Sequence, residues 1–114
     1  MSFTVYTNPK ALEKAGFTNA QFKKLDGLYL QAAARKVLMH RTVDVDFDEG
    51  VAMYTYFKSE AQAPFLQFCI RKVGPSTMMY EVYLQHKGRI KKSGVFDIAF
   101  ERLEKEIEIL LESA

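Results

Sequence analysis

The middle of the chain, residues 43–84, alternates apolar and polar side chains with a period of two, as β-strands do. The tripeptide Asp48–Gly50 suits a three-residue hairpin loop, because glycine adopts the left-handed conformation at little cost. A loop of this length would place Val45 opposite Met53, so that apolar side chains of both strands share one face. The same register pairs Phe47 with Val51 and Val43 with Thr55.

A second hairpin is expected around Gly74–Ser76, a Gly-Pro-Ser turn that sets Val73 against Thr77. Counting back from this turn, apolar side chains again face one another across the two strands. The expected pairs are Ile70 with Tyr80, Phe68 with Val82, and Leu66 with Leu84. Together the two hairpins predict a four-stranded antiparallel meander.

Three helices are expected around this sheet. An Asn-Pro pair opens a short helix at residues 9–15. Thr18 and Gln21 form a capping box, which starts a second helix that ends near residue 39. An apolar stripe at helical spacing predicts a long last helix over residues 94–112.

These elements predict a two-layer α+β fold, with two N-terminal helices, a four-stranded antiparallel β-meander and a long C-terminal helix. Their order is (β)ααββββα, in which the bracketed edge strand is the weakly alternating segment 2–6. A chain of 114 residues with 48% hydrophobic side chains can bury its own core, so we expect a single domain over residues 1–114.

The sequence indicates a reducing compartment and no membrane insertion. A single cysteine, Cys69, excludes an intramolecular disulfide. The N-terminal residues lack the basic and then apolar regions of a signal peptide, and no apolar run approaches the ~20 residues of a membrane span. We therefore expect a cytoplasmic protein.

Charge is sorted along the chain in a way that the net charge of +2 hides. Residues 1–42 and 51–92 are strongly basic, whereas residues 43–50 and 93–114 are acidic. Sorting of this kind constrains which elements lie side by side and where an anionic partner could bind.

Charges at the helix ends suggest how two helices pack. Lys23 and Lys24 lie at the start of the second helix and Glu108 and Glu112 at the end of the last, where the helix dipole disfavours each sign. Both unfavourable interactions would be compensated if the helices ran antiparallel side by side, with the lysines near the glutamates, in one chain or across a dimer. The sequence therefore predicts that arrangement.

No motif of an enzyme, a metal site or a cofactor site is present. The acidic run Asp44–Gly50 fails the EF-hand pattern, because Glu49 stands where glycine is required and Thr55 where glutamate is. Cys69 has neither a flanking signature of a cysteine enzyme nor a histidine near it in sequence. We expect a protein that is not an enzyme and has no cofactor.

The predicted sheet leaves aromatic side chains on the face away from the core, and interface cores favour tyrosine, phenylalanine, methionine and arginine. The leading hypothesis is a non-catalytic binding or assembly module that forms a homo-oligomer or binds a protein partner through this face. The expected interface residues are Tyr54, Tyr56, Phe65, Met79 and Tyr83.

The first alternative is single-stranded nucleic-acid binding, with Tyr54, Tyr56 and Tyr83 as a stacking platform. The segment 86–92 is expected to be an exposed loop or short hairpin, and it is the densest basic part of the chain. Its phosphate contacts would be Lys87, Arg89, Lys91 and Lys92. A net charge of only +2 weighs against this hypothesis.

The second alternative is a binder of a small apolar ligand. The order of the helices and the long closing helix resemble those of helix-grip ligand binders in topology, although this chain has fewer strands than that family. A cavity of this kind would be lined by Met53, Met78, Phe57, Phe68 and Phe96.

Overall fold

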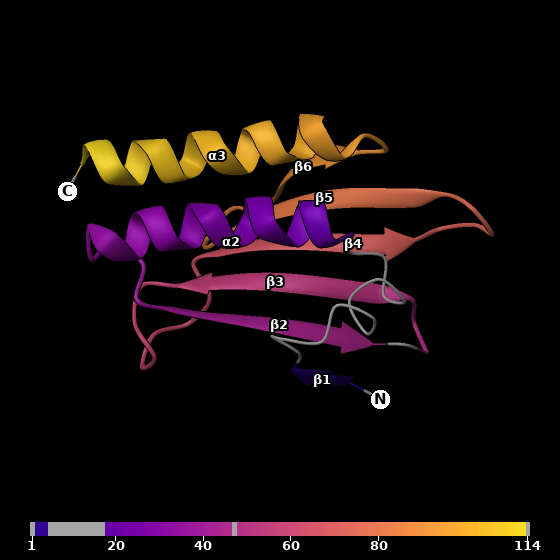
Figure 1. Cartoon of the computed structure of the whole chain (residues 1–114), viewed down its shortest axis with the longest axis horizontal. Coiled ribbons are helices and arrows are strands. Elements are labelled where there is room, and N and C mark those ends of the chain that lie inside the picture. Colours follow the sequence, from indigo (N-terminus) through magenta and orange to yellow (C-terminus); the bar gives the residue numbers. More distant parts are fainter. Residues whose placement is uncertain (1, 5–17, 47, 114) are drawn as a thin grey trace.

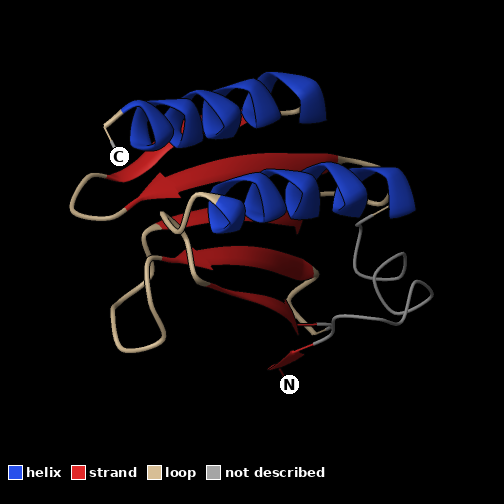
Figure 2. Ribbon diagram, turned by 60° about the vertical axis from the view of Figure 1, so that its left-hand side comes forward, coloured by secondary structure: helices blue, strands red, loops and turns tan. Residues whose placement is uncertain are grey.

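The computed structural model describes residues 2–4, 18–46 and 48–113. It has an α+β fold in which both described helices lie on one face of an antiparallel sheet (Figures 1 and 2). The expected helix at residues 9–15 lies outside the described residues. The elements are β1 (Ser2–Thr4), α2 (Asn19–Ala34), β2 (His40–Asp46), β3 (Val51–Phe57), β4 (Leu66–Lys72), β5 (Met78–Leu84), β6 (Gly88–Ser93) and α3 (Phe96–Glu112).

The sheet has one more strand in its meander than the sequence predicted. Strands β2 to β6 follow one another in order, and β1 pairs with β2 at the far edge. The extra strand, β6, comes from the basic segment that was expected to be a loop or short hairpin. Its only apolar side chain is Ile90, which packs against the core, so alternation gave no strand signal there.

The register between β2 and β3 differs from the predicted one by a single residue. Val45 pairs with Ala52 rather than Met53, and Val43 pairs with Tyr54. Because strand side chains alternate between faces, this shift turns Tyr54 and Tyr56 toward the helices. The inward hydroxyls find partners there: that of Tyr54 donates to Asp26 Oδ1 at 2.6 Å, and that of Tyr56 donates to the Leu25 carbonyl at 2.8 Å.

The predicted register of the second hairpin is confirmed. Ile70 pairs with Tyr80, Phe68 with Val82 and Leu66 with Leu84. The capping box of α2 is also present, with reciprocal hydrogen bonds between Thr18 and Gln21. The helix ends at Ala34, earlier than expected, because Lys36 takes a positive φ and turns the chain toward β2.

The helices run parallel, so the antiparallel arrangement predicted from their charges is wrong within one chain (Figure 1). Lys24 Nζ lies 3.4 Å from Asp97 Oδ1, which joins the N-terminal ends of α2 and α3. The extra strand explains the error. α2 precedes β2 and α3 follows β6, and these two strands are parallel because the meander between them has five strands. A four-stranded meander would have reversed α3.

Candidate functional site

The face of the sheet opposite α2 and α3, here called the open face, is the candidate site (Figure 2). Side chains in each strand alternate between this face and the core, so the register assigns them. The open face carries Asp44 on β2, Val51, Met53 and Thr55 on β3, Gln67, Cys69 and Arg71 on β4, Met79, Glu81 and Tyr83 on β5, and Arg89 and Lys92 on β6.

A buried glutamate lies near the centre of this face. Only 5% of the Glu81 side chain is exposed, although no described helix covers it. Its two carboxylate oxygens accept separate bonds, Oε1 from Arg71 Nε at 3.3 Å and Oε2 from Arg89 Nη1 at 2.9 Å. Burial favours a higher pKa for Glu81, but the bonds from Arg89 and Arg71 outweigh it and hold the pKa below its ordinary value. The cluster therefore stays charged and carries a net charge of +1.

Cys69 lies beside this cluster on the adjacent strand and is fully buried. Burial raises the pKa of its thiol to about 11, with the nearby Arg71 guanidinium acting in the opposite direction. At neutral pH the thiol is protonated, so the side chain is a packing group rather than a nucleophile.

This protonation state can be measured with a thiol reagent. At pH 8 a rise in pKa from 9.0 to about 11 lowers the thiolate fraction about 100-fold, so native Cys69 should react at least that much more slowly than in urea. Ellman's reagent follows both rates. Equal rates in buffer and urea would contradict the buried placement of Cys69.

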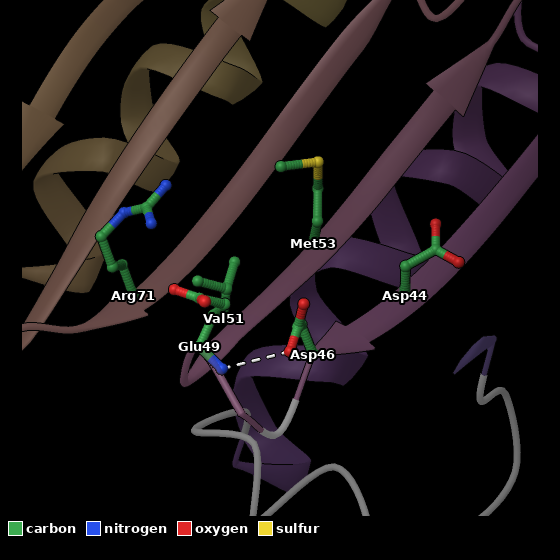
Figure 3. Close-up of a pocket in the computed structure, with 6 residues that line it drawn as sticks. All are labelled: Asp44, Asp46, Glu49, Val51, Met53 and Arg71. Carbon is green, nitrogen blue, oxygen red and sulfur yellow. Dashed lines mark hydrogen bonds between the residues drawn. The ribbon is translucent and has the colours of Figure 1, made fainter. Parts of the chain in front are cut away.

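A hollow of about 290 Å³ opens at the β2–β3 end of the open face (Figure 3). Acidic side chains line one side of it, and Arg71 reaches in from β4 on the other. The backbone N–H of Glu49 donates to Asp46 Oδ1 at 3.1 Å, which orders the turn at its rim. The lining residues are Asp44, Asp46, Glu49, Val51, Met53 and Arg71.

The predicted interface residues divide between the two faces. Met79 and Tyr83 lie on the open face as expected. Placing Tyr54 and Tyr56 there was wrong, because both are fully buried under the helices. Phe65 precedes β4 and packs against the core, with Lys58 Nζ 4.4 Å from its ring centroid. The sequence missed Val51 and Met53, which the one-residue register error had placed in the core.

The predicted phosphate contacts are also divided. Lys87 lies in the turn before β6, and Arg89 and Lys92 lie on the open face opposite Tyr83 and Glu81. Lys91 pairs with Val82 and so belongs to the other face. Arg89 is bound to Glu81, so the four cations do not form one continuous basic track.

Of the five residues expected to line an apolar cavity, Phe68, Met78 and Phe96 pack in the core instead, and Met53 and Phe57 lie on the open face. Phe96 of α3 lies with its ring centroid 5.3 Å from that of Phe68 and 5.5 Å from those of Tyr80 and Phe100. Met53 is on the open face, away from this cluster. In these contacts the aromatic rings pack against one another rather than against a ligand.

No protein-family model matches the chain, and no match was found among curated proteins or solved structures. In the described part of the chain, neither helix has the length and apolar composition needed to cross a bilayer. Within the same residues, no three His, Cys, Asp or Glu side chains gather as metal ligands.

Proposed function

We propose that this chain is a non-catalytic, cytoplasmic binding module that contacts a protein partner through the open face. One observation carries the proposal: the centre of this face is packed like a protein interior, yet no described helix covers it. Cys69 and Glu81 are both buried, with 0% and 4% of their surface exposed. The open face offers two methionines, a tyrosine and two arginines, residue types enriched at interface cores.

The charges of the face suit burial against a partner. Burying an unpaired ion costs several kcal/mol, but Glu81 is already held between Arg71 and Arg89. The side chains of Arg71 and Arg89 are 42% and 47% exposed. Their guanidinium groups can therefore contact a partner while they remain bonded to the Glu81 carboxylate. The apolar surface of the open face comes from Val51, Met53 and Met79, which are half-buried.

A photo-reactive amino acid placed on the open face tests this function directly. Substituted for Met53 in the full chain, in the cells that make the protein, it should cross-link to a protein upon irradiation. The matched control is Met39, a half-exposed methionine between α2 and β2, which should give no such product. Absence of a protein adduct at position 53, or equal adducts at both positions, would overturn the proposal.

Single-stranded nucleic acid is the competing partner, and the purified chain can be tested for it. Of the expected stacking platform only Tyr83 lies on the open face, so we expect no binding. Light scattering at low salt, with and without a mixed pool of single-stranded oligonucleotides, should give the same mass. A heavier species that dissociates as salt is raised would contradict the proposal.

A further inference from the structure

The open face is sorted by charge from one side to the other. On the β2 side, Asp44 and Asp46 carry negative charge, joined by Glu49 in the following turn. On the β6 side, Arg89 and Lys92 carry positive charge. Strand β4 lies midway between the two sides. Asp44 accepts a bond from Thr42 Oγ1, and Asp46 accepts bonds from the backbone N–H groups of Asp48 and Glu49.

We infer that the partner of the open face is a second copy of this chain, related by a two-fold axis that runs close to the direction of β4. The inference rests on the proposed function and names its partner. A two-fold interface brings the same patch of both copies together. An axis along β4 exchanges the two sides of the sheet, so the acidic β2 side of each copy meets the basic β6 side of the other. A two-fold axis across the strands would instead place the acidic β2 side of one copy on the acidic β2 side of the other, and these like charges would repel.

The strand register makes the match specific at individual residues. Asp44, Met53, Cys69, Glu81 and Lys92 form one row across the sheet. An axis along β4 keeps each row in place and reverses its order. Asp44 of one copy then lies opposite Lys92 of the second, twice per dimer, while the buried Cys69 stays on the axis.

Shape supports the same arrangement. The hollow of about 290 Å³ lies on the β2 side, where carboxylates line it. The long cationic side chains of Arg89 and Lys92 lie on the β6 side. Because each row stays in place, facing copies would bring Lys92 of one copy over Asp44 at the hollow of the other, so an acidic hollow receives a cationic side chain.

The open face is large enough for an interface of moderate size. Five strands about 4.8 Å apart and six or seven residues long, at about 3.3 Å per residue, cover roughly 550 Å² before side-chain relief is counted. A standard interface buries about 800 Å² per partner. Interfaces below the standard size are typical of transient association, so we expect a reversible dimer.

Charge reversal tests the pairing of Asp44 with Lys92. Asp44→Lys and Lys92→Asp should each weaken the dimer about tenfold, because each replaces two attractions with two repulsions. The double variant should restore wild-type association, which loss of folding cannot explain. Sedimentation velocity measures the dissociation constants. A wild-type chain that stays monomeric at 200 μM, or a double variant no better than the singles, overturns the inference.

Cross-linking tests the direction of the axis in the Cys69→Ala background. Asp44→Cys and Lys92→Cys chains should not cross-link with themselves, because equal positions lie about 19 Å apart laterally, four strand spacings. Their mixture should cross-link with a short bismaleimide, since facing sheets lie about 10 Å apart. Cross-linking of either chain alone overturns the proposed axis. If both dimer tests fail while position 53 still captures a different protein, only the identity of the partner is wrong.

Discussion

Replacing Tyr54 with alanine should lower the free energy of unfolding by about 3–5 kcal/mol, whereas Met53→Ala should lower it by about 1 kcal/mol. The two residues are neighbours on β3 but lie on opposite faces. Tyr54 is fully buried, with its ring centroid 4.8 Å from that of Tyr56 and 5.9 Å from that of Phe22. Met53 is half-buried on the open face. Urea unfolding at micromolar concentration measures both changes.

This pair of substitutions discriminates between the two possible registers of β3. In the register predicted from the sequence, Met53 would lie in the core and the larger loss would belong to Met53→Ala. Tyr54→Phe is the matched control, because it keeps the ring and removes only the hydroxyl that donates to Asp26. It should cost about 1.5–3 kcal/mol, the range for a bond to a charged group. A larger loss at Met53 than at Tyr54 would refute the observed register.

The second hairpin could be predicted from the sequence and the first could not, for a physical reason. Around Gly74–Ser76, only one register places apolar side chains on the same face of both strands. Strand β3 is apolar on both faces, with Tyr54 and Tyr56 on one and Val51 and Met53 on the other. Either register then satisfies the pattern, and the choice depends on tertiary partners such as Asp26 and the Leu25 carbonyl.

One missed strand also accounts for the error in helix direction. The backbone of β6 is held by pairing with β5, and its side chains are mostly cationic, so side-chain alternation carried no signal. With this strand included, α3 runs in the opposite direction to the predicted one, and Lys24 pairs with Asp97 rather than with the expected Glu108.

The prediction of the candidate site also depended on which strands were predicted. Met79 and Tyr83 were assigned to the open face because their hairpin was predicted correctly. Arg89 was not assigned to the sheet because β6 was missing from the prediction.

The double substitution Arg71→Met with Arg89→Met should destabilise the chain by about 3 kcal/mol, because it leaves the Glu81 carboxylate covered and unpartnered. Methionine keeps the aliphatic length that covers Glu81, so loss of packing is small. Each single substitution should cost less, since the other arginine still binds one carboxylate oxygen. Urea unfolding gives the three values, and a double variant as stable as wild type would show that the cluster contributes nothing.

A rescue variant separates the lost ion pairs from any general damage to the sheet. Adding Glu81→Leu to the two methionine substitutions removes the unpartnered charge, and apolar replacement of a buried ionic group is often neutral or stabilising. The triple variant should therefore regain most of the stability that the double variant loses. If the triple variant is less stable than the double, the loss comes from packing and not from the charge on Glu81.

The same cluster predicts how stability depends on pH. The pKa of Glu81 is lower in the folded chain than its ordinary value of 4.5, so its ionised form favours folding. This contribution is fully present above pH 4.5 and is lost as the pH falls through the lower, folded pKa. The stability difference between wild type and Glu81→Gln should thus shrink on acidification below pH 4.5, when both are unfolded in urea at each pH. A difference that stays constant down to pH 3, or that grows, would mean that the two arginines do not hold Glu81 in its charged form.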